Sequence, residues 1–121
     1  MDDLKNLMIL DVEVGVNRLA GDRELYEQIL EIFFTEAERQ IAQLEEAVAN
    51  GEHRTVMQIA HSIKGAASNI GALRIQKVAF ELEKIGNENR MGEAVDVFTQ
   101  LKDEFQQIKE FWYEEAESVK Y

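Results

Sequence analysis

The sequence predicts an all-α fold, an antiparallel up-down-up-down four-helix bundle with a short extra helix near the N-terminus. Apolar residues recur at intervals of three and four over nearly the whole chain, and no segment alternates with the period of two that a strand requires. The chain has 121 residues and contains no proline. This length suits one hydrophobic core, so we expect a single domain over residues 1–121.

The first expected helix is short and covers about residues 11–19. Its apolar residues Val12, Val16 and Leu19 share a face that can close one end of the bundle. The bundle core then follows at about residues 22–118. Its helices are joined by short loops, which favour antiparallel packing of neighbouring helices.

Two helices make up the first half of the expected bundle. One begins after Asp22, a favourable N-cap residue, and stops at Asn50-Gly51. The other covers about residues 52–69 and breaks at Gly71. The residues expected to face the core are Tyr26, Ile29, Phe33, Ala37, Ile41, Leu44 and Val48 in the first of these helices and Val56, Ala60, Ile63, Ala67 and Ile70 in the second.

Two more helices complete the bundle. The third is expected at about residues 72–85, where Gly86-Asn87 ends it, and the fourth at about residues 92–118. The residues expected to face the core are Ile75, Val78, Ala79, Leu82 and Ile85 in the third helix and Val95, Phe98, Leu101, Phe105, Ile108 and Trp112 in the fourth.

Composition excludes several classes of function. The net charge of −11, from 13 basic and 24 acidic residues, would repel a nucleic-acid backbone. The absence of cysteine excludes disulfide frameworks, thiolate metal sites and cysteine nucleophiles. The N-terminus is acidic, unlike a secretory signal, and no segment approaches the roughly 18 apolar residues of a membrane span. We therefore expect a soluble, cytoplasmic protein that binds neither nucleic acid nor membrane.

Motifs for metal ions and nucleotides are also missing. A ferritin-like di-metal bundle needs Glu-x-x-His pairs, but Asn50 and Gln58 stand three residues before His53 and His61. The sequence contains no phosphate-binding glycine loop. We accordingly expect no metal, no cofactor and no ATP site. His53 is interpreted as a solvated surface residue without a role.

The segment AHSIKGAASNIGA, residues 60–72, carries the candidate chemistry. Helix geometry places Lys64, Gly65 and Ser68 on the same face as His61. A neutral imidazole is a nucleophile near pH 7 and can accept a phosphoryl group, whose negative charge the Lys64 ammonium would stabilise. Gly65 costs the helix about 0.5 to 1 kcal/mol relative to alanine. This cost is explained if the missing side chain lets a partner reach the imidazole.

Two further residues are candidates for the same site. Ser68 could add a hydroxyl hydrogen bond, although solvation explains a serine on a helix surface equally well. If the second and third helices turn back near Ala72, Glu83 lies level with His61 and can accept a hydrogen bond from its other ring nitrogen. The alternative for Glu83 is a solvated carboxylate in an acidic helix.

With His61, Lys64, Gly65 and Gly71 in register, this segment resembles the signature of histidine-containing phosphotransfer (HPt) domains, the relay modules of bacterial multistep two-component signalling. The upstream stretch GVNRLAGDRELYEQILEIFF is similar to the first long helix of that family and its entry, and the resemblance extends over about residues 10–112. It implies that His61 takes a phosphoryl group from an aspartyl phosphate on a receiver domain and passes it to another receiver. Lys64 would be the charge partner and Gly65 the clearance position. Magnesium would reside on the receiver, so the protein needs no cofactor.

The resemblance also implies the partners, which are response-regulator receiver domains and a hybrid histidine kinase, and we expect the protein to act as a monomer. The family often has Glu or Gln where Glu83 stands. We expect a stand-alone HPt protein, with a module cut from a larger hybrid kinase as the alternative. Two other functions are a chemotaxis-type domain phosphorylated directly by an ATP-binding kinase and a non-catalytic docking adaptor. The presence of Lys64 and Gly65 disfavours the adaptor.

Overall fold

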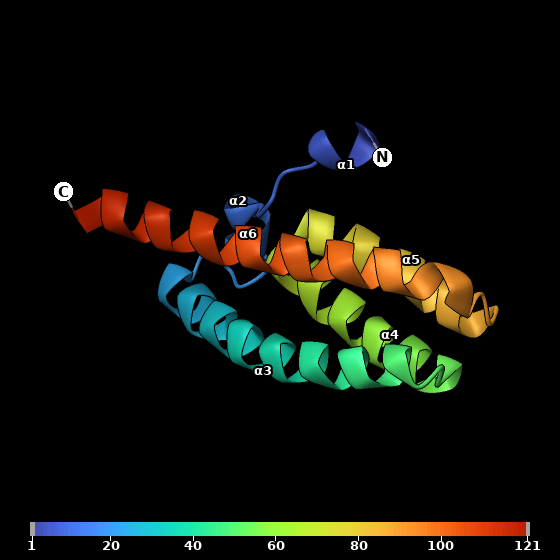
Figure 1. Ribbon diagram of the computed structural model, residues 1–121. Coiled ribbons are helices and arrows are strands. Elements are labelled where there is room, and N and C mark those ends of the chain that lie inside the picture. Colours follow the sequence, from blue (N-terminus) through green and yellow to red (C-terminus); the bar gives the residue numbers. More distant parts are fainter. Residues whose placement is uncertain (1, 121) are drawn as a thin grey trace.

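The chain folds into helices, as the spacing of its apolar residues predicts (Figure 1). The computed structural model describes the backbone of residues 2–120 and the side chains of residues 4–114. Within this range it contains no strand, which confirms the all-α fold class. The expected domain of residues 1–121 therefore includes both terminal residues, which lie outside the described part.

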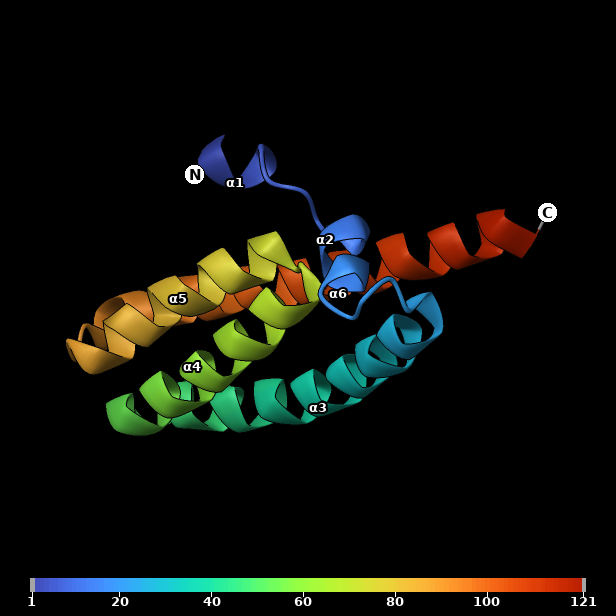
Figure 2. The ribbon, with the colours of Figure 1, turned by 180° about the vertical axis from the view of Figure 1, so that it is seen from behind.

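Four long helices form the body of the molecule. In chain order the elements are α1 (Asp2–Lys5), α2 (Val12–Asn17), α3 (Arg23–Ala49), α4 (His53–Ile70), α5 (Leu73–Asn87), the 3₁₀ helix η1 (Met91–Glu93) and α6 (Ala94–Lys120). Helices α3 to α6 pack in a ring in which α6 returns to contact α3. Figures 1 and 2 show α2 at the end of α4 where the chain turns into α5, and α2 contacts both α3 and α4.

The start of α3 and the end of α4 are set by the residues that the sequence singles out. The Asp22 carboxylate accepts a hydrogen bond from the Leu25 N–H at 3.0 Å and caps α3. Gly71 ends α4 in the left-handed conformation, with φ of 80°. A side chain there would also collide with the Asp11 carbonyl oxygen. The Asp11 N–H donates to the Gly71 carbonyl at 2.8 Å, which ties the turn between α4 and α5 to the N-terminal segment.

The expected core residues of α4 and α5 are all buried. In α6 one expectation is wrong, because Val95 is 60% exposed while Ala94 is buried. Ala94 lies four residues before Phe98 and therefore shares its face, whereas Val95 is rotated by about 100° away from that face. Three residues of α3 that we expected in the core, Ile29, Ile41 and Val48, are only partly buried and pack against the edge of the core.

Gly86 does not end its helix, contrary to the expectation. Helix α5 continues to Asn87, and Gly86 is buried inside it. A Cβ at Gly86 would lie 2.7 Å from both the His53 carbonyl oxygen and the Met57 nitrogen, so this glycine lets the backbones of α4 and α5 approach closely. The interpretation of His53 as a solvated residue is also wrong. Its side chain is half-buried, and its Nδ1 lies 3.1 Å from the Gly86 carbonyl oxygen.

Candidate functional site

His61 stands in the middle of α4, at the edge of the bundle. Its neighbours Ala60 and Ile63 are buried, while the imidazole side chain is 67% exposed. The helical spacing produces this arrangement, because residues that flank a core stripe project to its side. The histidine is therefore fixed on a rigid helix and accessible from solvent.

Glu83 of α5 joins His61 to Lys64. Its Oε2 accepts a hydrogen bond from His61 Nδ1 at 2.6 Å, and its Oε1 accepts one from the Lys64 ammonium at 2.6 Å. The structure therefore places Glu83 level with His61, as expected. Because a carboxylate can only accept, the proton of the neutral imidazole resides on Nδ1. The lone pair of Nε2 is then left for chemistry, and no hydrogen bond from the described residues reaches that atom.

Two opposing effects set the charge of Glu83. Burial raises the pKa of its carboxyl, but hydrogen bonds from Lys64 and His61 and their charges lower it by more. The net pKa of Glu83 is below its ordinary value of 4.5, so the carboxylate is ionised at neutral pH. The site therefore contains an ionised carboxylate between the Lys64 ammonium and the His61 imidazole.

Gly65 faces open space. A Cβ built on it meets no atom within 4 Å among the described residues, apart from its chain neighbours and its own helix backbone. Gly86 differs, because it is buried against α4, where a larger residue would not fit. Packing within this chain therefore does not explain why position 65 is a glycine.

Ser68 does not reach the imidazole. Seven residues of helix place it about 10 Å farther along the axis of α4 than His61. Its carbonyl oxygen accepts a hydrogen bond from the Arg18 guanidinium, so its backbone contributes to holding the N-terminal segment. The hydroxyl next to His61 is instead that of Ser62, which accepts a hydrogen bond from Gln40 of α3 at 2.9 Å.

Phe80 is a neighbour of the site to which the sequence analysis assigned no role. The Lys64 ammonium lies 5.0 Å from the centroid of its ring, a cation–π distance. Phe80 precedes Glu83 by three residues on α5, so the two side chains share the face of that helix that we expected to lie toward His61. Lys64 is consequently held by a carboxylate and an aromatic face, and its side chain is 27% exposed.

The structure also bears on metal binding and on membrane insertion. Among the side chains that the structure describes, no group of three or more histidine, aspartate or glutamate residues could hold a metal ion. None of the helices in the described range is long and apolar enough to cross a membrane.

Comparison with known proteins identifies the family. The family model of the Hpt domain matches residues 28–111, and the chain belongs to this family. This match confirms the resemblance to the HPt family seen in residues 60–72. Proteins of this family are phosphoryl carriers, and their partners are receiver domains and histidine kinases.

Two individual proteins are similar to the chain. The crystal structure of histidine-containing phosphotransfer protein B (HptB) from Pseudomonas aeruginosa PAO1 has the same fold, with a TM-score of 0.82 and 24% identity, and the match covers 91% of this chain and 96% of that one. Sensor protein EvgS of Escherichia coli (strain K12) is 31% identical over 74 residues. Those residues are 61% of this chain and only 6% of EvgS, so the chain spans a small part of that relative.

Proposed function

We propose that His61 is the residue that carries the phosphoryl group in a multistep phosphorelay. It accepts the group from an aspartyl phosphate of one receiver domain and passes it to the aspartate of another. The observation that carries this proposal is the exposed imidazole whose Nδ1–H is bound to Glu83 at 2.6 Å. That hydrogen bond directs the lone pair of Nε2 toward solvent, where a partner can approach.

The transfer step follows from this arrangement. The Nε2 lone pair attacks phosphorus, the N–P bond forms, and the P–O bond to the aspartate breaks with its electron pair leaving on the carboxylate. The proton on Nδ1 stays in its hydrogen bond to Glu83, which stabilises the positive charge that develops on the ring. The onward transfer to a second receiver is the reverse of this step.

Lys64 and Gly65 support the same step. The Lys64 ammonium lies one turn from His61 and can turn from Glu83 toward the phosphoryl oxygens, which stabilises their charge. Gly65 leaves space above the helix beside the imidazole, which the active site of a receiver fills when it closes over Nε2. Alignment and charge stabilisation supply most of the catalysis of phosphoryl transfer, and Lys64 and Gly65 would contribute to these two effects.

The wider proposal concerns architecture and setting. It comprises one domain, an up-down-up-down order of the four long helices, and a short extra helix before them. The colour sequence in Figure 1 supports this order, because each long helix runs back along the preceding one. We further place the protein in the cytoplasm as a monomeric carrier without an ATP site, which uses the magnesium of its receiver partners. A net charge of −11 supports protein partners over nucleic acid.

Transfer of label from a phosphorylated receiver domain tests the proposal. The wild type should acquire an acid-labile label, as a phosphoramidate does, and His61→Gln should acquire none. Lys64→Ala should fold normally and take up label more slowly. His53→Gln is the matched control, because this second histidine is half-buried on the same helix, and it should still be labelled. Label on His61→Gln equal to that on the wild type would show that the assignment is wrong.

A further inference from the structure

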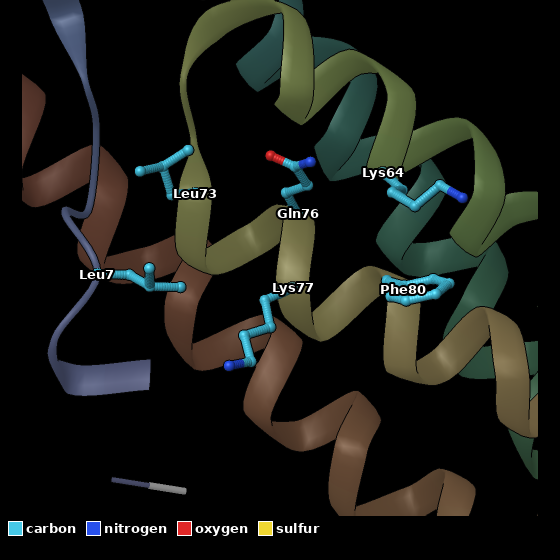
Figure 3. A pocket seen from close by; sticks show the side chains of 6 residues that line it. All are labelled: Leu7, Lys64, Leu73, Gln76, Lys77 and Phe80. Atoms are coloured by element: carbon cyan, nitrogen blue, oxygen red, sulfur yellow. The ribbon is translucent and has the colours of Figure 1, made fainter. Parts of the chain in front are cut away.

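Helix α5 offers Lys64 two contacts of different kinds. Phe80 and Glu83 are three residues apart on this helix, which separates them by about 4.5 Å along its axis and keeps them on one face. The Lys64 ammonium reaches across from α4, donates to Glu83 at 2.6 Å and lies 5.0 Å from the centroid of the Phe80 ring. Figure 3 shows the Lys64 side chain beside this ring. The charge of Lys64 is therefore held by a carboxylate and by an aromatic face.

The surroundings of Lys64 leave its side chain room to move. A hollow of about 470 Å³ opens next to it, and the hollow is lined by Leu7, Lys64, Leu73, Gln76, Lys77 and Phe80. Lysine has a flexible stem of four carbons, so contacts at its end decide where the charge lies. The Phe80 side chain is 47% exposed, and packing of the core does not explain an aromatic residue at this position.

The two contacts of Lys64 respond differently to an incoming phosphoryl group. The hydrogen bond to Glu83 requires an N–H group that points at the carboxylate, and phosphoryl oxygens compete for the same ammonium. An aromatic ring attracts a cation through the negative charge over its whole face, so this attraction depends little on where the N–H groups point. The ammonium can therefore turn from Glu83 to phosphoryl oxygens and remain over the Phe80 ring.

From these contacts we propose that Phe80 is a positioning residue for phosphoryl transfer and acts through Lys64. Its ring keeps the ammonium in place after the ammonium leaves Glu83. The inference rests on the proposed function of His61 and adds a residue of α5 to the groups that act in the transfer step. Without the ring, Glu83 is the one polar group that holds the Lys64 charge among the residues that the structure describes. The strength of a cation–π contact at an exposed site corresponds to a change in rate of about two- to fivefold.

Labelling by phosphoramidate tests this role without a receiver domain. Nε2 of His61 forms a bond to phosphorus while the P–N bond of N-protonated phosphoramidate breaks, and the electron pair of that bond leaves on ammonia. Phe80→Leu should lower the rate of labelling about two- to fivefold. Phe80→Tyr keeps the ring and should be labelled as fast as the wild type. The double variant Lys64→Ala, Phe80→Leu should be no slower than Lys64→Ala, because the ring acts through the ammonium that is already missing.

Lys84→Ala is the matched control. The Lys84 ammonium lies 4.9 Å from the centroid of the same ring, but it is paired with Glu81 at 3.2 Å. This variant should be labelled at the wild-type rate. NMR provides a readout that does not depend on rates, because protons over an aromatic face resonate upfield. The ε-methylene protons of Lys64 should show this shift in the wild type before and after phosphorylation and should lose it in Phe80→Leu.

The outcomes separate the positioning role from the proposed function. A wild type that acquires no label at His61 would overturn both. Labelling of the wild type and of Phe80→Leu at equal rates would overturn only the positioning role, and slower transfer from a phosphorylated receiver in that variant would then assign the ring to contact with the receiver. A further loss in the double variant, or a loss in Lys84→Ala equal to that in Phe80→Leu, would also overturn the positioning role, since the ring would then act without Lys64.

Discussion

A side chain at position 65 should make the protein more stable and should slow phosphoryl transfer. Gly65 is exposed inside α4, and an added Cβ meets nothing within 4 Å, so substitution causes no clash. Alanine is favoured over glycine in a helix by about 1 kcal/mol, and glutamine keeps about half of that gain. With an unfolding entropy of about 2.1 cal/mol/K per residue, 1 kcal/mol raises the Tm of a chain of this size by about 4 °C.

The rate of transfer should change in the opposite direction. In the proposed function, a receiver approaches His61 through the space that a glutamine side chain at position 65 would occupy. Overfilling a close contact costs about 1 to 3 kcal/mol, and 1.4 kcal/mol corresponds to roughly a tenfold change. We expect Gly65→Gln to transfer from a phosphorylated receiver at least tenfold more slowly than the wild type and Gly65→Ala to fall between them. Thermal unfolding measures the change in stability, and a time course of phosphoryl transfer measures the change in rate.

Ala66 provides the matched control. It is exposed on the same helix, next to Gly65. Ala66→Gly should lose about 1 kcal/mol of stability without slowing transfer. The double variant Gly65→Ala, Ala66→Gly should have the stability of the wild type and the slower transfer of Gly65→Ala. If Gly65→Gln is stabilised and transfers as fast as the wild type, the clearance explanation of this glycine is refuted.

Two further predictions concern α5. Gly86→Ala should destabilise the protein by about 2 kcal/mol, as overpacking does, because the new Cβ would lie 2.7 Å from backbone atoms of His53 and Met57; unfolding in urea measures this, and a stability equal to that of the wild type would contradict the close contact. The partners of Glu83 lower the pKa of its carboxyl on folding. Its ion pair therefore stabilises the protein at a pH above 4.5, the ordinary pKa of the group, and this stabilisation is lost as the pH falls through the lowered pKa. The stability advantage of the wild type over Glu83→Gln should therefore be present at pH 7 and shrink below pH 4.5, and an advantage that does not change with pH would show that Glu83 is not ionised in the site.

Periodicity predicted the long helices because each has one face in the core. The caps at Asp22 and Gly71 followed from local chemistry that does not depend on the rest of the fold. The contact of Glu83 with His61 could be predicted because two antiparallel helices joined by a short turn have a fixed register. These are the features for which sequence spacing alone determines the position in space.

The features that could not be predicted from the sequence depend on contacts between segments that are distant along the chain. Gly86 has the sequence signature of a helix end, and only the proximity of α4 reveals it as a contact glycine. Arg74 donates hydrogen bonds to the backbone carbonyl oxygens of Leu7 and Lys5, which fixes the N-terminal segment along α5. The same side chain lies 4.0 Å from the buried Glu104 of α6. No periodic pattern encodes such pairs, because their partners are 30 or more residues apart.

The link from Lys64 through Glu83 to His61 has a consequence for the energetics of the relay. Among the three linked groups, the one ammonium, of Lys64, is paired with the one carboxylate, of Glu83. A phosphoryl group adds about two negative charges at neutral pH. Lys64 cannot neutralise the phosphate and Glu83 together, so the loaded site holds an excess of negative charge. If His61 carries the phosphoryl group as we propose, this excess would give the phosphorylated protein a high group-transfer potential and favour release of the group to a receiver aspartate.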